Sequence, residues 1–157
     1  IVGVSDADFA RLQAELPRAI RNQILVSTRW MTHFALFERE LYRTEKGDSQ
    51  LWYRGVHDIQ YLNVPEERLT KPDWAAKYHF AMAPVYYHNY LLGEMLASQF
   101  DHTLRAKGDG SDLTPEGGHW FVDYVFRPGA TYPWNTMIER ATGEPLNPSY
   151  LVQQFTL

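Results

Sequence analysis

The stretch PRAIRNQILVSTRWMTHFALFERELYR, residues 17–43, contains no glycine, and its only proline stands at the first position. Proline suits the first turn of a helix, because its missing N–H would have no helical partner there. Apolar residues recur every three, four or seven positions and form two stripes: Ile20, Ile24, Met31 and Phe34 on one, Val26, Trp30, Phe37 and Leu41 on the other. Two stripes predict a long helix from Pro17 to about Arg43 that is buried from two sides.

Helical patterns continue on both sides of this stretch, and no alternating segment longer than four residues indicates a strand. A short helix is expected before it, capped by Ser5 and ending near Leu16. Further helices are expected over residues 49–62, 85–107, 114–126, 133–141 and 148–155, with a helical turn at Pro72-Asp73. The sequence therefore predicts an all-α fold, bundle-like, that forms one compact unit over residues 1–157.

Composition excludes several classes of protein. The chain has 15 Lys plus Arg against 19 Asp plus Glu, a formal net charge of −4, and no cysteine. The acidic balance argues against nucleic acid as a partner, since nucleic-acid-binding proteins concentrate positive charge. Without cysteine there is no disulfide scaffold, thiolate zinc site or cysteine nucleophile. The longest apolar run, around residues 35–37, is broken by His33 and Glu38, so no membrane association through a spanning segment is expected.

Familiar catalytic motifs are missing from the sequence. There is no HExxH, no phosphate-binding loop, no GxSxG and no dinucleotide fingerprint. None of the six histidines stands at the spacing that builds a familiar zinc site, so the sequence predicts no metal site in this chain. The first residue is Ile1 rather than Met, and we expect a processed or trimmed chain, part of whose molecule is missing.

The densest group of polar and aromatic residues lies in residues 76–90 and includes Lys77, His79, Tyr87 and Tyr90. On a helix, two tyrosines three positions apart project from the same face. A cation, an imidazole and two phenols at a helix start can receive a carboxylate or a developing oxyanion. The alternative is that these residues only pack, with their polar tips satisfied. For the pair Glu38 and Glu40, a solvated helix face is the expected role.

The same segment resembles the C-terminal part of the angiotensin-converting-enzyme family, zinc dipeptidyl carboxypeptidases, and looks like a bacterial-type member. The resemblance rests on Ala76-Lys77-Tyr78-His79 followed by Pro84, Tyr87 and Tyr90. Two further segments are similar to family motifs in the same order: Leu51-Trp52-Tyr53 with Gln60 and Pro65, and Pro133-Trp134 with Thr142-Gly143-Glu144. The resemblance implies the helical C-terminal portion of a larger, mostly helical peptidase of the zincin type.

The resemblance also implies roles for single residues. Lys77 corresponds to the lysine that holds the peptide's C-terminal carboxylate, and His79 to the histidine that bonds a substrate carbonyl near the scissile bond. Tyr87 then binds the terminal carboxylate, and Tyr90 stabilises the oxyanion. A second register, without an insertion after His79, would give these last roles to Tyr86 and Asn89. The family's chloride-binding arginine has no counterpart, because His88 and Asn89 stand between the tyrosines.

The family's zinc ligands and its glutamate general base lie upstream of every segment matched here. Zinc with such a glutamate generates the attacking water, so this chain alone is expected to be inactive. The expected partners are therefore the N-terminal catalytic part of the same protein, which would hold the zinc, and a peptide substrate. The rival interpretation is a non-catalytic helical binding or interaction module.

Overall fold

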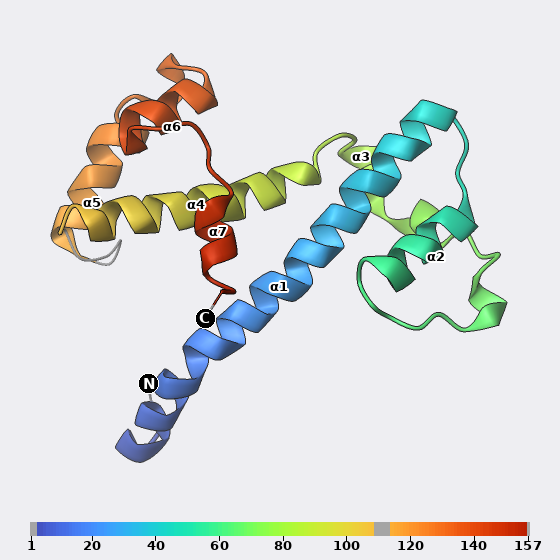
Figure 1. Ribbon diagram of the computed structural model, residues 1–157, viewed down its shortest axis with the longest axis horizontal. Coiled ribbons are helices and arrows are strands. Elements are labelled where there is room, and N and C mark those ends of the chain that lie inside the picture. The colour runs from blue at the N-terminus through green and yellow to red at the C-terminus, as the bar shows by residue number, and fades with distance from the viewer. Residues whose placement is uncertain (1–2, 109–113, 157) are drawn as a thin grey trace. The chain divides into compact units, whose positions relative to one another are not determined.

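The computed structural model describes residues 3–108 and 114–156, and within these ranges all regular structure is helical (Figure 1). This confirms the all-α prediction. The α-helices are α1 (Asp6–Thr44), α2 (Ser49–Asp58), α3 (Tyr78–Met82), α4 (His88–Ala106), α5 (Pro115–Phe121), α6 (Trp134–Thr142) and α7 (Ser149–Gln153). Short 3-10 helices are η1 (Glu66–Arg68), η2 (Asp73–Ala76) and η4 (Gly129–Thr131), and η3 (Val122–Phe126) is a π-helix.

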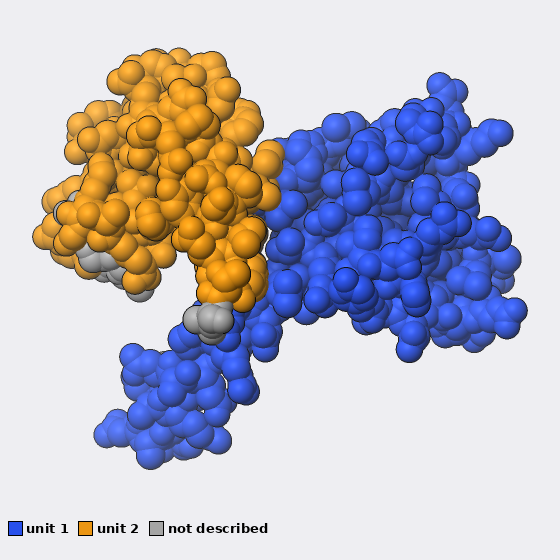
Figure 2. All heavy atoms as spheres, in the orientation of Figure 1, with its two compact units in different colours: residues 1–91 blue, residues 92–157 orange. Residues whose placement is uncertain are grey.

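The chain folds into two compact units, residues 1–91 and residues 92–157 (Figure 2). This differs from the single unit that the sequence predicts. The boundary falls inside α4, between Leu91 and Leu92, where the helix continues without interruption. A boundary within a helix carries no linker composition, so the sequence pattern could not reveal it. We describe the two units separately below as unit 1 (residues 1–91) and unit 2 (residues 92–157).

Helix α1 runs for 39 residues, with Pro17 inside it, so the prediction of two helices meeting at Pro17 is wrong. Ser5 is the N-cap as expected, and its hydroxyl accepts a hydrogen bond from the Asp8 amide at 3.1 Å. An internal proline removes one helical hydrogen bond. The residues around it are mostly good helix formers (Leu, Gln, Ala, Glu and Arg), and their preference carries the helix across that gap.

The core of unit 1 is aromatic and lies where α2 packs against the C-terminal part of α1 (Figure 1). Its buried members are Phe34, Phe37, Trp52 and Tyr53. Asp48, not the expected Ser49, is the N-cap of α2 and accepts from two backbone amides. The helix ends at Asp58 rather than near Leu62. Tyr61, just before that expected end, has a left-handed φ of 57°, which helical backbone does not permit.

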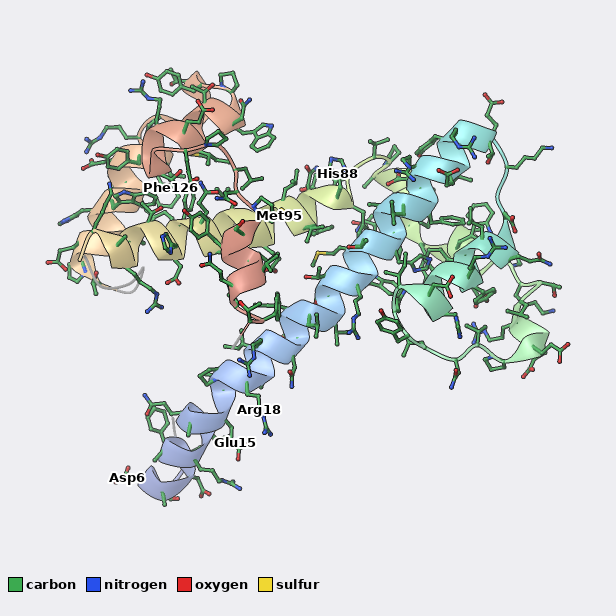
Figure 3. The ribbon with its side chains drawn as sticks, viewed as in Figure 1. Asp6, Glu15, Arg18, His88, Met95 and Phe126 are labelled. Atoms are coloured by element: carbon green, nitrogen blue, oxygen red, sulfur yellow. The ribbon has the colours of Figure 1, made fainter. Side chains whose placement is uncertain are left out.

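The two apolar stripes of α1 are covered only in its C-terminal part. Phe9, Leu12, Leu16 and Ile20 are exposed. Asp6, Glu15 and Arg18 mark the part of α1 along which no other described element of unit 1 packs (Figure 3). Burial from two sides, predicted for residues 17–43, is therefore wrong for the start of that range, where the stripe residues Ile20 and Val26 are exposed.

Unit 2 is built around the second part of α4. Its main buried cluster contains Phe100, Leu104, Trp120 and Ala141, and Ile138 and Leu151 are buried as well. Gln99 is completely buried, and its amide donates to Thr142 Oγ1 at 2.9 Å and accepts from the Asn147 backbone N–H at 2.8 Å. Helix α6 ends at Gly143, whose φ of 88° suits glycine, as the sequence predicts.

His33 is a buried titratable group in unit 1, only 1% exposed. Burial lowers its pKa from 6.5 to about 4, which the backbone of Trp52 only partly offsets. The unfolded chain takes up a proton below pH 6.5, while the folded chain resists protonation down to about pH 4. The stability that this neutral histidine contributes is therefore present above pH 6.5 and lost as the pH falls to 4.

We expect this loss to reach about 3 kcal/mol in the free energy of unfolding of unit 1, since one pKa unit corresponds to about 1.4 kcal/mol. Denaturant unfolding of the wild-type chain and of His33→Gln across this pH range measures it. The exposed His57 gives the matched control, and His57→Gln should leave the pH dependence in place. Parallel stability curves for wild type and His33→Gln would refute the assignment.

Within the described residues, no helix has both the length and the apolar character needed to cross a membrane.

Candidate functional site

A cavity of about 350 Å³ lies in unit 1, between the middle of α1 and the start of α4. Three of the four residues singled out in the sequence line it: His79, Tyr87 and Tyr90. The other lining residues are Val26, Ser27, Trp30, Met31 and Gln60. Residues that lie far apart in the sequence thus meet at one hollow, with an apolar wall from α1 and polar groups from residues 79–90.

The backbone between Lys77 and Tyr90 explains how these side chains come together. Lys77 is extended and precedes α3, so that His79 stands in the first turn of that short helix. A turn at Pro84 and Val85 follows, and α4 begins only at His88, labelled in Figure 3. Tyr87 therefore immediately precedes α4 instead of lying within a helix from Val85. The Tyr90 amide still bonds the Tyr87 carbonyl, at 3.3 Å.

Tyr87 is held on two sides. Its ring stacks on that of Phe34 with 4.1 Å between centroids, and its hydroxyl oxygen accepts a hydrogen bond from Trp30 Nε1 at 2.5 Å. Burial raises the pKa of Tyr87 above its ordinary value, so the hydroxyl stays protonated at neutral pH. Because Trp30 can only donate, the proton of Tyr87 remains available for an acceptor in the cavity.

His79 and Tyr90 complete the polar side of the cavity. The ring of His79 meets that of Tyr87 edge-on at 4.8 Å and that of Tyr90 at 6.1 Å. The two tyrosine rings lie 5.1 Å apart. Among the described residues, neither the imidazole of His79 nor the hydroxyl of Tyr90 has a hydrogen-bond partner. Both groups are therefore free to bond an incoming molecule.

Lys77 does not line the cavity itself, but its ammonium lies near the cavity wall. Its Nζ is 5.6 Å from the centre of the Trp30 ring, within the range of a cation–π contact. Lys77 makes no ion pair with a carboxylate in residues 3–108 or 114–156. Its positive charge thus stands over the ring of Trp30, and the nearby carboxylate of Asp73 interacts with it electrostatically without forming an ion pair.

The two registers left open by the sequence place different residues at the cavity. Tyr87 and Tyr90 line it, whereas Tyr86 and Asn89 do not. Tyr86 is about half exposed, and its ring meets that of Tyr90 edge-on, with 5.7 Å between the centroids. The geometry therefore groups Tyr87 with Tyr90 and His79, which is the arrangement that the inserted register requires.

Glu38 is the residue of this region that sequence reasoning missed. It is 5% exposed, so the expectation of a solvated helix face is wrong for this member of the pair. Its carboxylate accepts a hydrogen bond from the Val85 amide at 2.6 Å. The signal was in the spacing, because Glu38 follows Phe34 by four residues and precedes Leu41 by three. A carboxylate on an apolar stripe indicates a buried polar contact.

Val85 has a φ of 55°, in the left-handed region that β-branched residues avoid. Such a conformation costs about 1–3 kcal/mol and persists only where the surroundings enforce it. The turn that separates α3 from α4 is thus held in an unfavourable conformation directly before Tyr86 and Tyr87. Backbone strain of this kind is concentrated near binding and catalytic sites.

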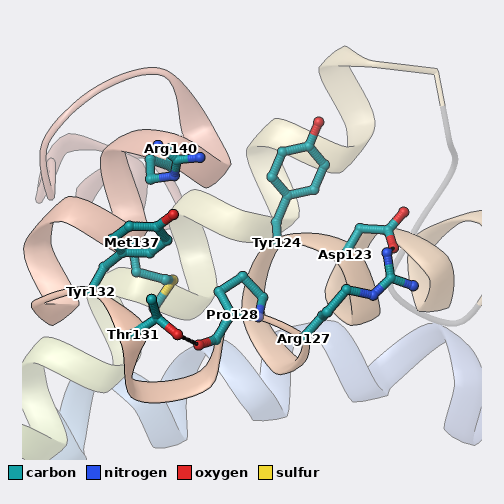
Figure 4. A pocket seen from close by; sticks show the side chains of 8 residues that line it. All are labelled: Asp123, Tyr124, Arg127, Pro128, Thr131, Tyr132, Met137 and Arg140. Carbon is teal, nitrogen blue, oxygen red and sulfur yellow. Dashed lines mark hydrogen bonds and ion pairs between the residues drawn. The ribbon is translucent and has the colours of Figure 1, made fainter.

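A second cavity, of about 530 Å³, lies in unit 2 beside the π-helix η3 (Figure 4). The guanidinium of Arg140 covers the ring of Tyr132 at 4.6 Å, and Arg127 pairs with Asp123 at 2.8 Å. The Thr131 hydroxyl donates to the Pro128 carbonyl at its base. This hollow contains none of the residues that the sequence singled out, and its arginines are exposed.

No three His, Cys, Asp or Glu side chains in residues 3–108 and 114–156 lie close enough to hold a metal ion together. The described donor set therefore does not fit a zinc site.

Comparison of the chain with protein-family models, with curated proteins and with solved structures gives no match.

Proposed function

We propose that the cavity lined by His79, Tyr87 and Tyr90 binds the C-terminal end of a peptide, with Lys77 holding the terminal carboxylate. The observation that supports this is that the three lining residues converge on one cavity and that the ammonium of Lys77 lies over the ring of Trp30. In this proposal the chain is the substrate-binding part of a zinc metallopeptidase that releases dipeptides from peptide C-termini.

The chemistry of the carboxylate explains why these groups suit it. A carboxylate accepts from an ammonium and from a hydroxyl at the same time, and hydrogen bonds that involve a charge are about twice as strong as neutral ones. Lys77 would supply the charge, and Tyr87 the proton that its bond from Trp30 leaves free. The aromatic wall lowers the local dielectric constant, so the attraction between Lys77 and the carboxylate exceeds that in water.

His79 and Tyr90 would act further along the bound peptide. An imidazole N–H can donate to a substrate carbonyl, and a phenol can stabilise the oxyanion that develops during hydrolysis. In this proposal the zinc that activates the attacking water is held by an N-terminal catalytic part outside the present sequence. The residues described here would bind and orient the peptide, and they would donate hydrogen bonds to its oxygens.

The proposal predicts a specific effect of Lys77→Ala. We expect N-acetyl-trialanine with a free carboxylate to bind the chain about ten-fold more weakly after this substitution, because one charge-assisted contact is lost. The C-terminal amide of the same peptide has no charge at that end, so its affinity should hardly change. Equilibrium titration of both peptides measures the two dissociation constants.

Lys71→Ala is the matched control, because it removes an exposed lysine six residues earlier. It should leave the preference for the free acid unchanged. Equal losses for acid and amide, or no loss for either, would contradict a carboxylate-binding role for Lys77. That outcome would favour the rival interpretation, a helical interaction module whose tyrosines only pack.

A further inference from the structure

We propose that Glu38 is a positioning residue for this cavity, because its carboxylate fixes the turn from which Tyr87 and Tyr90 extend. This inference rests on the proposed function, because it concerns the same cavity. Glu38 itself does not line the cavity and would not touch a bound peptide. It would act only through the backbone of Val85, which lies 47 residues away in the sequence.

A hydrogen bond joins Glu38 to the loop between α3 and α4. Glu38 belongs to the long helix α1, and its carboxylate oxygen Oε1 lies 2.6 Å from the Val85 amide nitrogen. A buried carboxylate needs such a partner, because an unpaired charge away from water is costly. A bond from an amide to a carboxylate is also stronger than one to a neutral acceptor. The rigid helix thereby holds one defined point of the loop between α3 and α4.

The backbone of Val85 has a conformation that requires a stabilising contact from outside its own turn. Val85 adopts a left-handed φ of 55°, which its branched side chain disfavours. Most of its side chain is exposed, so packing does not enforce the conformation. Among the described residues, the hydrogen bond to Glu38 is the one that the Val85 backbone makes outside its own turn. Removing that bond should let the turn relax toward ordinary backbone angles.

The turn at Val85 leads directly into the residues that line the cavity. Tyr87 is two residues beyond Val85, and the first amides of α4 bond back to the carbonyls of Tyr86 and Tyr87. A rotation at Val85 would therefore move the first turn of α4, which includes Tyr90. Phe34, one helical turn before Glu38 on α1, stacks on the ring of Tyr87 at 4.1 Å. Helix α1 thus holds Tyr87 in three ways: Trp30 binds its hydroxyl, Phe34 stacks on its ring, and Glu38 binds the turn before it.

The test compares three substitutions that separate length from charge. Glu38→Gln keeps the length and an acceptor oxygen, Glu38→Asp keeps the charge but is too short to reach, and Glu38→Ala removes both. Glu40→Ala is the matched control, because Glu40 lies on the same helix and pairs with Arg43 instead. Chains with ¹³C-labelled tyrosine rings report the positions of Tyr87 and Tyr90 by NMR, and hydrogen exchange reports the Val85 amide.

We expect the wild-type chain, Glu38→Gln and Glu40→Ala to share the same Tyr87 and Tyr90 signals. Glu38→Asp and Glu38→Ala should shift both signals, raise the exchange rate of the Val85 amide at least about ten-fold, and weaken binding of N-acetyl-trialanine by about ten-fold. A variant that is only less stable, but still folded, would not show the shifted tyrosine signals together with faster exchange of the Val85 amide. If Glu38→Ala does not fold, the contrast between the Gln and Asp variants decides.

Two results would overturn the inference. Unchanged tyrosine signals and an unchanged Val85 exchange rate in Glu38→Asp would show that the bond does not position the turn. The opposite pattern would also overturn it. If Glu38→Asp behaved like the wild-type chain and Glu38→Gln like Glu38→Ala, the charge of Glu38 and not its hydrogen bond would be what matters. If the wild-type chain binds no peptide, the proposed function fails, and the ring signals and the amide exchange still decide the role of Glu38.

Discussion

Replacing Phe34 by alanine should lower the free energy of unfolding of unit 1 by about 3–5 kcal/mol, the usual cost of removing a fully buried phenylalanine. Phe34 is 1% exposed, and its ring stacks on those of Phe80 at 4.8 Å and Tyr87 at 4.1 Å. It also meets Trp52 edge-on at 5.2 Å. The substitution therefore opens a cavity at the centre of the aromatic core and removes one support of Tyr87.

Denaturant unfolding followed by tryptophan fluorescence measures this effect. Leu36→Ala is the matched control, because Leu36 lies two residues away on the same helix but is exposed. Its cost should be well below that of Phe34→Ala. Equal costs for the two variants would show that the aromatic cluster does not form the core of unit 1.

If the proposed function holds, Tyr90→Phe should reduce turnover of the complete peptidase by about 10²–10³, with little change in substrate binding. The reason is that a phenol directed at the oxyanion acts mainly in the transition state. Tyr86→Phe is the matched control, since Tyr86 lies on the same turn but does not line the cavity. Steady-state kinetics on one dipeptide-releasing substrate gives the turnover number and KM of each variant.

The other register makes the opposite prediction. If Tyr86 and Asn89 carried the roles, Tyr90→Phe would be nearly silent, and Asn89→Ala would depress turnover. A full-rate Tyr90→Phe enzyme would therefore contradict the assignment of Tyr90, whatever the result for Asn89.

The helical class was predictable because periodic apolar residues and cap residues are local signals. Ser5 as a cap, the turn at residues 73–76 and the stop at Gly143 all follow from residues within a few positions of the feature. The continuity of α1 across Pro17 was not predictable in this way, because a proline signals a helix start as readily as an internal position. Whether a helix continues through a proline depends on the residues on both sides of it.

Three of the four residues that the sequence singled out line one cavity, but the contacts that hold them in place could not be predicted. The spacing of Tyr87 and Tyr90 and their nearness to His79 along the chain were visible in the sequence, and the three line one cavity. The contacts from Trp30 and Glu38 come from 57 and 47 residues away. Such long-range bonds depend on how α1 packs against the later turns, which no local pattern encodes.

The most direct test of the central claim is an NMR titration of the chain, ¹³C-labelled in its histidine and tyrosine rings, with N-acetyl-trialanine and with its amide. The account predicts that the free acid shifts the signals of His79, Tyr87 and Tyr90 in a saturable way, while Tyr132 in unit 2 stays unchanged. The amide should produce much weaker shifts at the same concentration. Equal shifts with acid and amide, or saturable shifts that leave all three residues unaffected, would contradict a carboxylate-binding site in this cavity.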